Sequence, residues 1–235
     1  MGQVLKEKSS SDDNDNTGKL SASDRVAEAI LQDIRSGRLV PGQHLLEPEL
    51  TSRLGKSRGS LREALKHLAA AGIVDLNRFR GAYIAALDRK SVLDLLDTLE
   101  PLARLAARLA ATNCPNDRAA QRLVKSAKVL EDLRLSGQRG DYLNERRRFY
   151  DMMVEMGGNV ELARAMPLSR TDLFRAQVET RQSESQRRRH AEGYAKIAAA
   201  VQARDAAAAD KAVADHFAGT RKTMAELPAE VFPNG

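Results

Sequence analysis

The sequence predicts a mainly α protein in two parts: an N-terminal winged helix-turn-helix with a small β-hairpin wing, then an all-α antiparallel bundle of about six helices. The first observation is a pair of short helical patterns joined by a glycine turn, between Glu47 and Gly72. The second is a pair of β-prone runs directly after them. The third is a change of composition at Asp88, beyond which alanine, leucine, arginine and glutamate dominate.

Residues 1–20 are polar, with SSSDDNDNTG at their centre. They are too poor in apolar side chains to offset the entropy of ordering, so we predict a disordered tail. A first helix is predicted to begin at Ser23-Asp24, which offers an N-cap, and to end near Gly37. Its apolar residues recur at helical spacing and form one buried stripe: Val26, Ala29, Ile30 and Ile34.

The central helical pair begins at Glu47 with Pro48 in the first turn, where a missing N–H costs nothing, and its first helix ends at Gly55. Ser57 is a good N-cap for the second helix. One stripe of that helix is apolar: Leu61, Ala64, Leu65 and Leu68. A neighbouring stripe is basic: Arg58, Arg62 and Lys66. This combination is typical of a helix-turn-helix that reads the DNA major groove, although the charge spacing equally fits an ordinary helix with a solvated basic face.

The residues after Gly72 favour a β-hairpin. Residues 73–76 and 82–85 are β-prone and flank a turn that ends in Gly81. Arg78 and Arg80 lie at its predicted tip, where a wing would meet phosphates or a minor groove. A basic hairpin directly after a basic helix favours the DNA-binding interpretation over the solvated face.

Composition bears on the compartment and on the partners. The net charge of +6 suits a polyanion such as double-stranded DNA without requiring one. Cys114 is the single cysteine, which excludes an internal disulfide framework and fits a reducing cytoplasm. No apolar run approaches the roughly 20 residues that span a bilayer, and the N-terminus lacks a hydrophobic signal core. We therefore expect a cytoplasmic protein with no membrane partner.

From Asp88 onward, helical patterns alternate with breaks. The predicted helices occupy residues 90–113, 117–135, 140–157, 160–180, 184–203 and 206–226. Helices of this length with short connections form antiparallel bundles. We therefore place a domain boundary between Leu87 and Asp88, and we expect the bundle to end at residue 228, before a C-terminal tail over residues 229–235.

Residues 25–87 resemble the winged-helix domain of GntR-type bacterial transcription regulators. The residues that match are Gly37, Pro41-Gly42, Leu50, Leu54-Gly55, Ser57-Arg58, Leu61-Arg62-Glu63-Ala64-Leu65, Leu68, Gly72 and Gly81. The helical remainder resembles the effector domain of the FadR subfamily, the FCD domain. That likeness rests on Leu99-Glu100, on Gly158-Asn159 and on the stretch from Ile197 through Asp205 to His216.

The resemblance implies a set of contacts with operator bases and phosphates: Ser57, Arg58, Ser60, Arg62, and Arg80 and Gly81 on the wing. Lys56 and Arg78 extend the same basic surface. A bidentate pair between Arg58 or Arg62 and guanine is the expected base contact. Lys56 replaces the small apolar residue usual before the Ser-Arg pair, and Gly59 weakens the first turn of the recognition helix, so the operator sequence stays open.

Many domains that resemble the FCD type hold a metal through an Asp and a His four apart on one helix and a His on each of the last two helices. The matching positions here are Arg146, Tyr150, Tyr194 and His216. Tyr194 and His216 each lie eleven residues from Asp205, so a helical hairpin turning there would bring them face to face. Arginine cannot release a proton to bind a cation, and one histidine is not a site. We therefore predict no zinc or other transition metal, and no cofactor.

An anion is the occupant that these four positions would suit. A guanidinium, two phenols and an imidazole would grip a carboxylate or phosphate through charge-assisted hydrogen bonds. The alternative is that Arg146 belongs to a solvated run of arginines over residues 146–148, while the tyrosines simply fill the bundle core. The other histidines are predicted to be scattered surface residues: His44, His67 and His190.

Together these patterns predict a ligand-responsive bacterial transcription regulator, with repression the commoner outcome in the resembled family. It would bind a roughly palindromic operator as a homodimer through residues 21–87, and residues 88–228 would dimerise and bind a small organic acid as effector. Two alternatives remain: an architectural nucleic-acid binder without an effector, and a helical-bundle enzyme with an accessory DNA-binding domain. No spacing suggests a nucleophile with its base, so we predict no catalytic residues.

Overall fold

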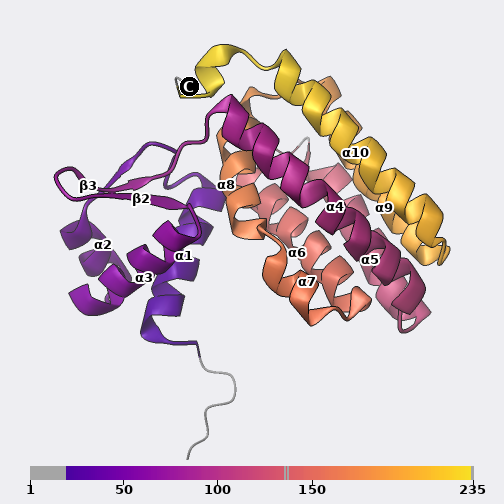
Figure 1. The fold of residues 1–235 in the computed structure, drawn as a ribbon, viewed down its shortest axis with the longest axis horizontal. Coiled ribbons are helices and arrows are strands. Elements are labelled where there is room, and N and C mark those ends of the chain that lie inside the picture. The colour runs from indigo at the N-terminus through magenta and orange to yellow at the C-terminus, as the bar shows by residue number, and fades with distance from the viewer. Residues whose placement is uncertain (1–19, 135, 137, 234–235) are drawn as a thin grey trace, which may run out of the picture.

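The computed structural model describes residues 20–134, 136 and 138–233. Apart from Leu20, the predicted disordered tail over residues 1–20 lies outside the described residues. The predicted fold class is confirmed, because a winged part with a small sheet lies beside a larger, all-helical part (Figure 1).

Helix α1, Ala22–Ser36, begins slightly earlier than predicted because Ser21 and Asp24 form a reciprocal capping box. Asp24 donates its N–H to Ser21 Oγ at 3.0 Å, and Ser21 donates its N–H to Asp24 Oδ2 at 3.2 Å. Gly37 ends the helix in the left-handed conformation, with a φ of 81°. The predicted stripe is buried at Val26, Ile30 and Ile34, with Ala29 half-buried.

Helices α2, Glu47–Leu54, and α3, Arg58–Ala70, form the predicted helix-turn-helix. Gly55 ends α2 with a φ of 60°, a conformation that glycine adopts without a Cβ penalty. Ser57 caps α3, as predicted. The apolar stripe of α3 is buried against α1: Leu61, Ala64, Leu65 and Leu68.

The winged part contains a three-stranded antiparallel sheet in the order β1-β3-β2. The predicted hairpin is formed by β2, Val74–Asn77, and β3, Gly81–Ile84. The third strand, β1, His44–Leu45, pairs with β3 and was not predicted, because two residues are too few to show an alternating pattern.

The bundle contains seven α-helices in the described part of the chain rather than about six. They are α4 (Arg89–Asn113), α5 (Asp117–Leu133), α6 (Arg139–Gly157), α7 (Val160–Ala165), α8 (Leu168–Val178), α9 (Glu184–Gln202) and α10 (Ala206–Glu226). The single helix predicted over 160–180 was wrong. Pro167 forces Met166 into an extended conformation, with a ψ of 115°, and so separates α7 from α8.

Two short 3₁₀ helices complete the described chain: η1, Glu179–Arg181, after α8, and η2, Ala229–Val231, after α10. Within the predicted C-terminal tail, Phe232 is buried and the Arg89 guanidinium lies 4.5 Å from its ring centroid. The residues after α10 therefore pack against the start of α4.

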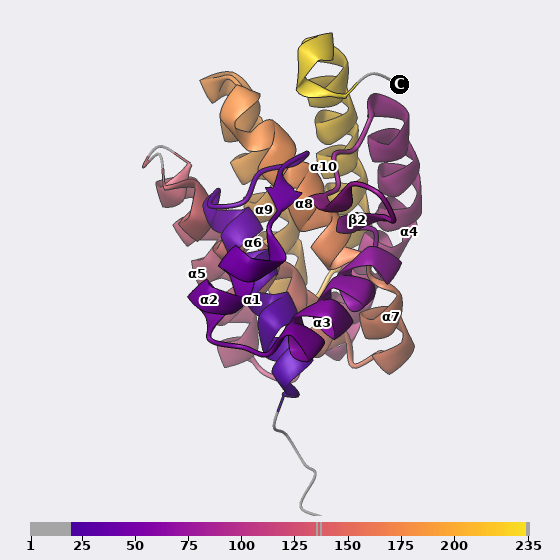
Figure 2. The same cartoon turned by 90° about the vertical axis from the view of Figure 1, so that its left-hand side faces the viewer.

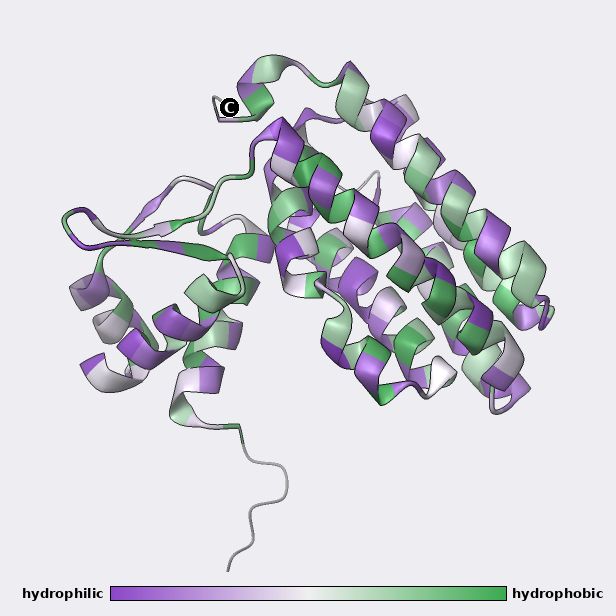
Figure 3. Cartoon of the chain, viewed as in Figure 1, coloured by the Kyte–Doolittle hydropathy of each residue, from purple (hydrophilic) through white to green (hydrophobic). Residues whose placement is uncertain are grey.

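The bundle helices pack in pairs, with α4 between α10 and α6, and α5 against α9 and α6. Hydrophobic and hydrophilic residues alternate along these helices, as expected where one stripe faces a core (Figure 3). Seen from the winged side, α1, α2 and α3 lie in front of α6, α8 and α9 (Figure 2).

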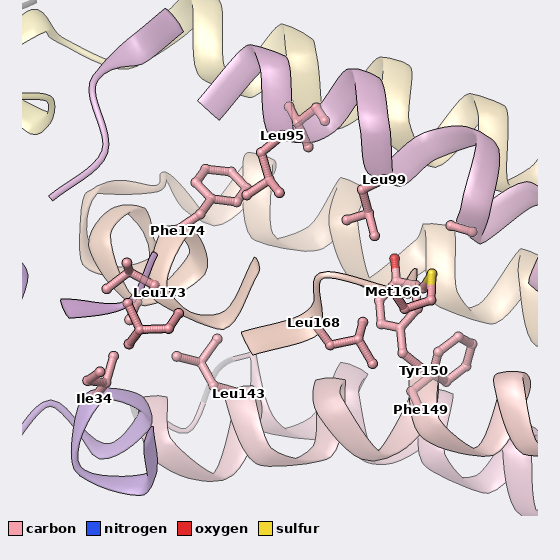
Figure 4. Packing of buried hydrophobic residues seen from close by; sticks show 14 of the residues in the cluster. Ile34, Leu95, Leu99, Leu143, Phe149, Tyr150, Met166, Leu168, Leu173 and Phe174 are labelled. Atoms are coloured by element: carbon pink, nitrogen blue, oxygen red, sulfur yellow. The ribbon is translucent and has the colours of Figure 1, made fainter. Parts of the chain in front are cut away.

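One apolar core runs through both parts. Ile34 of α1, Leu143 of α6 and Leu173 of α8 gather where the two parts meet (Figure 4). The winged part is therefore packed onto the bundle through α1, and α6 and α8 form the other side of that contact. None of the helices in the described ranges is long and apolar enough to cross a membrane.

Candidate DNA-binding surface and buried polar cluster

The basic stripe of α3 lies on the surface. The side chains of Arg62 and Lys66 are each 66% exposed, and Arg58 is exposed as well. We call these three residues the α3 ridge. The buried leucines of α3 face α1 and so hold the ridge outward, where it is free to meet a duplex.

The first turn of α3 presents hydroxyl groups beside the ridge. Ser60 donates its N–H to Ser57 Oγ at 3.1 Å, and the two hydroxyl oxygens lie 3.0 Å apart. Lys56 is half-buried just before this turn. N–H groups and a positive dipole end point outward at the start of a helix, so this place suits a phosphate.

Acidic neighbours hold two side chains of the ridge. Arg62 Nε donates to Glu47 Oε2 of α2 at 3.2 Å, and Lys66 Nζ donates to Glu63 Oε1 at 2.9 Å. Both pairs are exposed, so they are screened by salt and contribute little to stability. Either cation can therefore exchange its carboxylate for a phosphate or a base.

The wing carries its charge at an exposed tip that projects away from the rest of the molecule (Figure 1). Asn77 Oδ1 accepts hydrogen bonds from the N–H groups of Phe79 and Arg80, at 2.9 and 3.0 Å, and so closes the turn. Arg78 and Arg80 are exposed on either side of Phe79, whose side chain is 92% exposed.

Gly81 follows the tip, and two structural features favour glycine at this position. Its φ is 87°, and a Cβ there would lie 2.9 Å from His44 Nε2. The His44 ring stacks on Tyr83, with 4.7 Å between the ring centroids. The wing therefore meets β1 closely at the position where the sequence predicts a DNA contact.

The four predicted effector-binding residues lie together in the bundle interior. The ring centroids of Tyr194 and His216 are 4.7 Å apart, so the predicted face-to-face arrangement across the α9–α10 hairpin is confirmed. Tyr150 lies 6.2 Å from Tyr194, and the Arg146 guanidinium lies 5.0 Å from the Tyr150 ring. Gly193 permits the close crossing, since a Cβ there would lie 2.1 Å from His216 Nδ1.

The alternative that Arg146 belongs to a solvated run was wrong. Arg146 is 2% exposed, and of its two neighbours only Arg148 points into solvent. The two tyrosines are nevertheless buried in the apolar core, as that alternative also predicted. Arg146 is thus an interior cation that faces the ring of Tyr150.

The prediction that His190 is a surface residue was also wrong. It is 6% exposed, and its ring centroid lies 4.2 Å from that of His216 and 5.3 Å from that of Tyr194. The sequence feature that could have predicted its burial is its position four residues before Tyr194, which places both residues on one face of α9.

Arg175 on α8 belongs to the same interior and was not identified from the sequence. It is 1% exposed, and its Nη2 lies 3.4 Å from Glu179 Oε2. Residues 171–176 of α8 are all buried, so this part of the helix is covered on every side, and Thr171, Asp172 and Arg175 are buried with their apolar neighbours. The six residues that share this interior form what we call the buried polar cluster: Arg146, Tyr150, Arg175, His190, Tyr194 and His216.

Both histidines of the cluster are neutral at neutral pH. Burial, with Arg175 and Arg146 nearby, lowers the pKa of His216 to about 3. Burial, Arg175 and His216 hold the pKa of His190 well below its usual range. A neutral imidazole offers one donor and one acceptor, so the cluster can bind a polar ligand without taking up a proton.

Several polar atoms of the cluster have no hydrogen-bond partner among the described residues. They are Arg146 Nε, Arg175 Nε and Nη1, His190 Nδ1, Tyr194 Oη and His216 Nδ1. Buried polar atoms in folded proteins are nearly always paired, so their concentration in one place indicates groups that serve a ligand or water.

Asp172 on α8 joins the cluster to the winged part. It is 1% exposed, and its carboxylate pairs with Arg146 at 3.2 Å, with Arg147 at 2.8 Å and with Arg35 of α1 at 3.4 Å. Burial raises the pKa of Asp172, against the opposing effect of the three arginines. Within the cluster itself, Arg146 faces the carboxylate of Asp172 and Arg175 faces that of Glu179, and all four residues are buried.

A cleft of about 100 Å³ between α9 and α10 is lined by two residues of the cluster, His190 and His216, and by Gly193. A larger hollow of about 590 Å³ lies where α4 and α6 end and α5 begins, and no residue of the cluster lines it. The described residues contain no group of three or more His, Cys, Asp or Glu side chains placed to hold a metal ion.

Comparison with protein families gives two matches. Residues 22–84 match the family described as bacterial regulatory proteins, gntR family, and residues 92–219 match the FCD domain. A probable D-xylose utilization operon transcriptional repressor of Paenarthrobacter nicotinovorans is 26% identical over 90% of this chain and 89% of its own length. The galactonate operon transcriptional repressor of Escherichia coli K12 is 33% identical over 32% of this chain and 33% of its own.

Solved structures share the fold. McbR/YncC of E. coli matches with a TM-score of 0.78 and 18% identity, over 88% of this chain and 99% of that one. A putative GntR regulator of Rhodococcus sp. RHA1 matches with a TM-score of 0.68 and 16% identity, over 88% and 99%. The basic ridge, the wing and the two family matches agree: this chain belongs to the GntR family of bacterial transcription regulators and carries an FCD domain.

Proposed function

We propose that the protein is a ligand-responsive transcription regulator that binds a roughly palindromic operator as a homodimer. Two copies of α3 would enter successive major grooves about 34 Å apart, which is one turn of the duplex. The observation that carries this proposal is the exposed α3 ridge beside an exposed basic wing tip. Residues 21–87 would form the DNA-binding domain, and residues 88–228 the effector-binding and dimerisation domain.

The operator contacts divide by chemistry. Arg58 and Arg62 would reach base edges, because a guanidinium pairs with two acceptors of guanine. Ser57 and Ser60 would bind phosphate at the start of α3. The remaining contacts would come from the flanking basic residues and the wing: Lys56, Arg78, Arg80 and Gly81.

The effector would be a small organic acid held by Arg146, Tyr150, Tyr194 and His216. The unpaired nitrogen atoms of Arg175 and the His190 ring extend the same set of donors. A carboxylate there would face the guanidinium groups of Arg146 and Arg175 and pair with polar atoms that otherwise lack partners among the described residues. Two of the relatives are named as repressors and two, from two E. coli strains, as the Glc operon transcriptional activator; we propose repression for this chain.

Selection of genomic fragments bound by the full-length protein tests the DNA-binding proposal, and footprinting of the best fragment follows. We expect one protected site with two inverted half-sites, 10 to 10.5 base pairs apart from centre to centre or a multiple of that, and two chains per site by sedimentation. Equal affinity for unrelated duplexes would instead indicate an architectural nucleic-acid binder.

A thermal-shift screen of organic acids tests the effector proposal, with Arg146→Ala and Arg148→Ala compared with wild type. Arg148 is exposed on the same helix and is the matched control. We expect at least one acid to stabilise wild type and Arg148→Ala and to leave Arg146→Ala unchanged. Equal responses from all three proteins, or none from wild type, count against an acid bound at Arg146.

A further inference from the structure

Helix α8 touches the winged part at several places along its length. Arg170 Nη1 lies 3.4 Å from the carbonyl oxygen of Gly72, which follows α3 directly. Gln177 accepts from the Leu87 N–H at 3.0 Å and donates to the Leu87 carbonyl at 2.8 Å, in the segment between wing and bundle. Asp172, between these two contacts, pairs with Arg35 of α1. A shift of α8 therefore acts on the element that supports α3.

The Asp172 carboxylate contacts cations of both the bundle and the winged part. Its Oδ1 faces the Arg146 Nη1 of the buried polar cluster at 3.2 Å. Its Oδ2 faces Arg35 Nη1 at 3.4 Å and Arg147 Nη2 at 2.8 Å. One negative charge thus holds a cation of the cluster and a cation of α1 at the same time, away from water.

We propose that Asp172 and an anionic effector compete for the Arg146 guanidinium. When the effector binds, it displaces the Asp172 carboxylate from Arg146 and thereby changes the ion pair between Asp172 and Arg35. This proposal rests on the organic-acid site proposed above and describes how occupation of that site reaches α3. Asp172 would act as an internal carboxylate that competes with the ligand for one guanidinium.

Electrostatics gives the reason for the competition. An anion that pairs with Arg146 brings a second negative charge close to Asp172 Oδ1 in a water-poor interior, where like charges repel strongly. Asp172 lowers this repulsion by turning toward Arg35 and Arg147, which keep it paired. The ligand then distinguishes between two arrangements of Asp172, as any effector must in order to shift an equilibrium.

Arg35 has other partners that can keep it paired when the position of the Asp172 carboxylate changes. It also donates to Asn144 Oδ1 at 2.8 Å, to Gln32 Oε1 at 3.0 Å and to Glu28 Oε1 at 2.5 Å. Arg147 likewise has a second partner, Ser169 Oγ, at 3.1 Å. Neither cation is left without a partner when Asp172 moves, so both arrangements avoid an unpaired buried charge.

The test is a double-mutant cycle on operator affinity in the full-length protein, with the best fragment from the genomic selection and no added ligand. Arg146→Gln frees Asp172 from the cluster and mimics the occupied site. We expect it to change the operator Kd by roughly fivefold or more, which is the lower range of measured allosteric couplings. In a protein that already carries Arg35→Gln, adding Arg146→Gln should change the operator Kd by no more than about twofold, because the ion pair between Asp172 and α1 is already absent.

Arg148→Gln and Arg25→Gln are the matched controls, since Arg148 is an exposed arginine of α6, the helix of Arg146, and Arg25 is an exposed arginine of α1, the helix of Arg35. If Arg146→Gln does not fold, as judged by circular dichroism, Arg146→Lys replaces it in the cycle, because an ammonium cannot reproduce the guanidinium geometry. Independent, additive effects of the two substitutions, or an unchanged Kd in the Arg146 variant, would overturn the proposal. A wild type that selects no preferred fragment would instead refute the regulator function itself, so the two failures are distinguishable.

Discussion

Asp172 on α8 and Arg35 on α1 lie 3.4 Å apart in the protein interior, so a buried ion pair joins the helical bundle to the winged part. The same carboxylate holds Arg146 and Arg147 of α6. Three elements distant in sequence thus depend on one negative charge.

The first prediction concerns that charge. Asp172→Asn should lower the free energy of unfolding by about 3 to 5 kcal/mol, because removing one partner of a buried ion pair leaves uncompensated cations. Urea denaturation of wild type and variant measures this difference in the free energy of unfolding. The control is Asp215→Asn, which breaks an exposed pair with Lys211 and should change the free energy by less than about 1 kcal/mol. Equal stabilities of the two variants would show that the carboxylate is dispensable.

The second prediction concerns the crossing of α9 and α10. Gly193→Ala places a Cβ 2.1 Å from His216 Nδ1, so the helices must separate or the ring must move. We expect a loss of about 1 to 3 kcal/mol, as for other overpacked sites. In the control Gly219→Ala, also within a helix, the nearest atom is the Arg189 Cδ at 3.5 Å, and alanine's helix propensity should give a gain of about 0.5 to 1 kcal/mol. A Gly193→Ala protein as stable as that control would contradict the close crossing.

The third prediction concerns pH. The pKa of His216 is lowered to about 3 in the folded protein, against an ordinary value of 6.5, so the unfolded chain binds the extra proton between those values. The stability from this group is complete above pH 6.5 and is lost as pH falls, at roughly 1.4 kcal/mol per pH unit. Urea denaturation at pH 6.0 and 5.0 should therefore show a smaller drop for His216→Gln than for wild type. Equal drops would mean that folding does not lower the pKa of His216.

The fourth prediction concerns the wing. Arg78→Ala and Arg80→Ala should weaken operator binding similarly on specific and unrelated duplexes, and each should reduce the slope of log Kd against log salt by about 1 if it contacts a phosphate. Fluorescence anisotropy at several salt concentrations measures this. Arg188→Ala, on the exposed face of α9, is the control and should leave the slope unchanged. If both wing variants keep the wild-type slope of log Kd against log salt, Arg78 and Arg80 do not contact phosphates of the operator.

The winged part was predictable because its signals are local. The glycine turn, the Ser57 cap and the spacing of Leu61 and Leu65 each specify structure within a few residues, and the structure has them as predicted. Local signals fail for short elements: β1 has two residues, and the break at Pro167 was passed over because the flanking residues continue a helical pattern.

The buried polar cluster was predictable only in part. Tyr194 and His216 could be paired because one hairpin relates them. Arg175 and Asp172 could not, because a buried charged residue looks like a solvated one in sequence, and the partners of Asp172 lie 26 and 137 residues away. Burial of residues 171–176 of α8 on all sides is a property of the whole bundle, which no window of residues contains.

The most direct test of the DNA-reading ridge is the base preference of Arg58→Ala and Arg62→Ala on the selected operator, measured against every single-base substitution in one half-site. Each variant should lose about 1 to 3 kcal/mol of binding free energy and become indifferent to the base that its guanidinium reads. If both variants keep the wild-type preference at every position, the ridge of α3 does not read the operator.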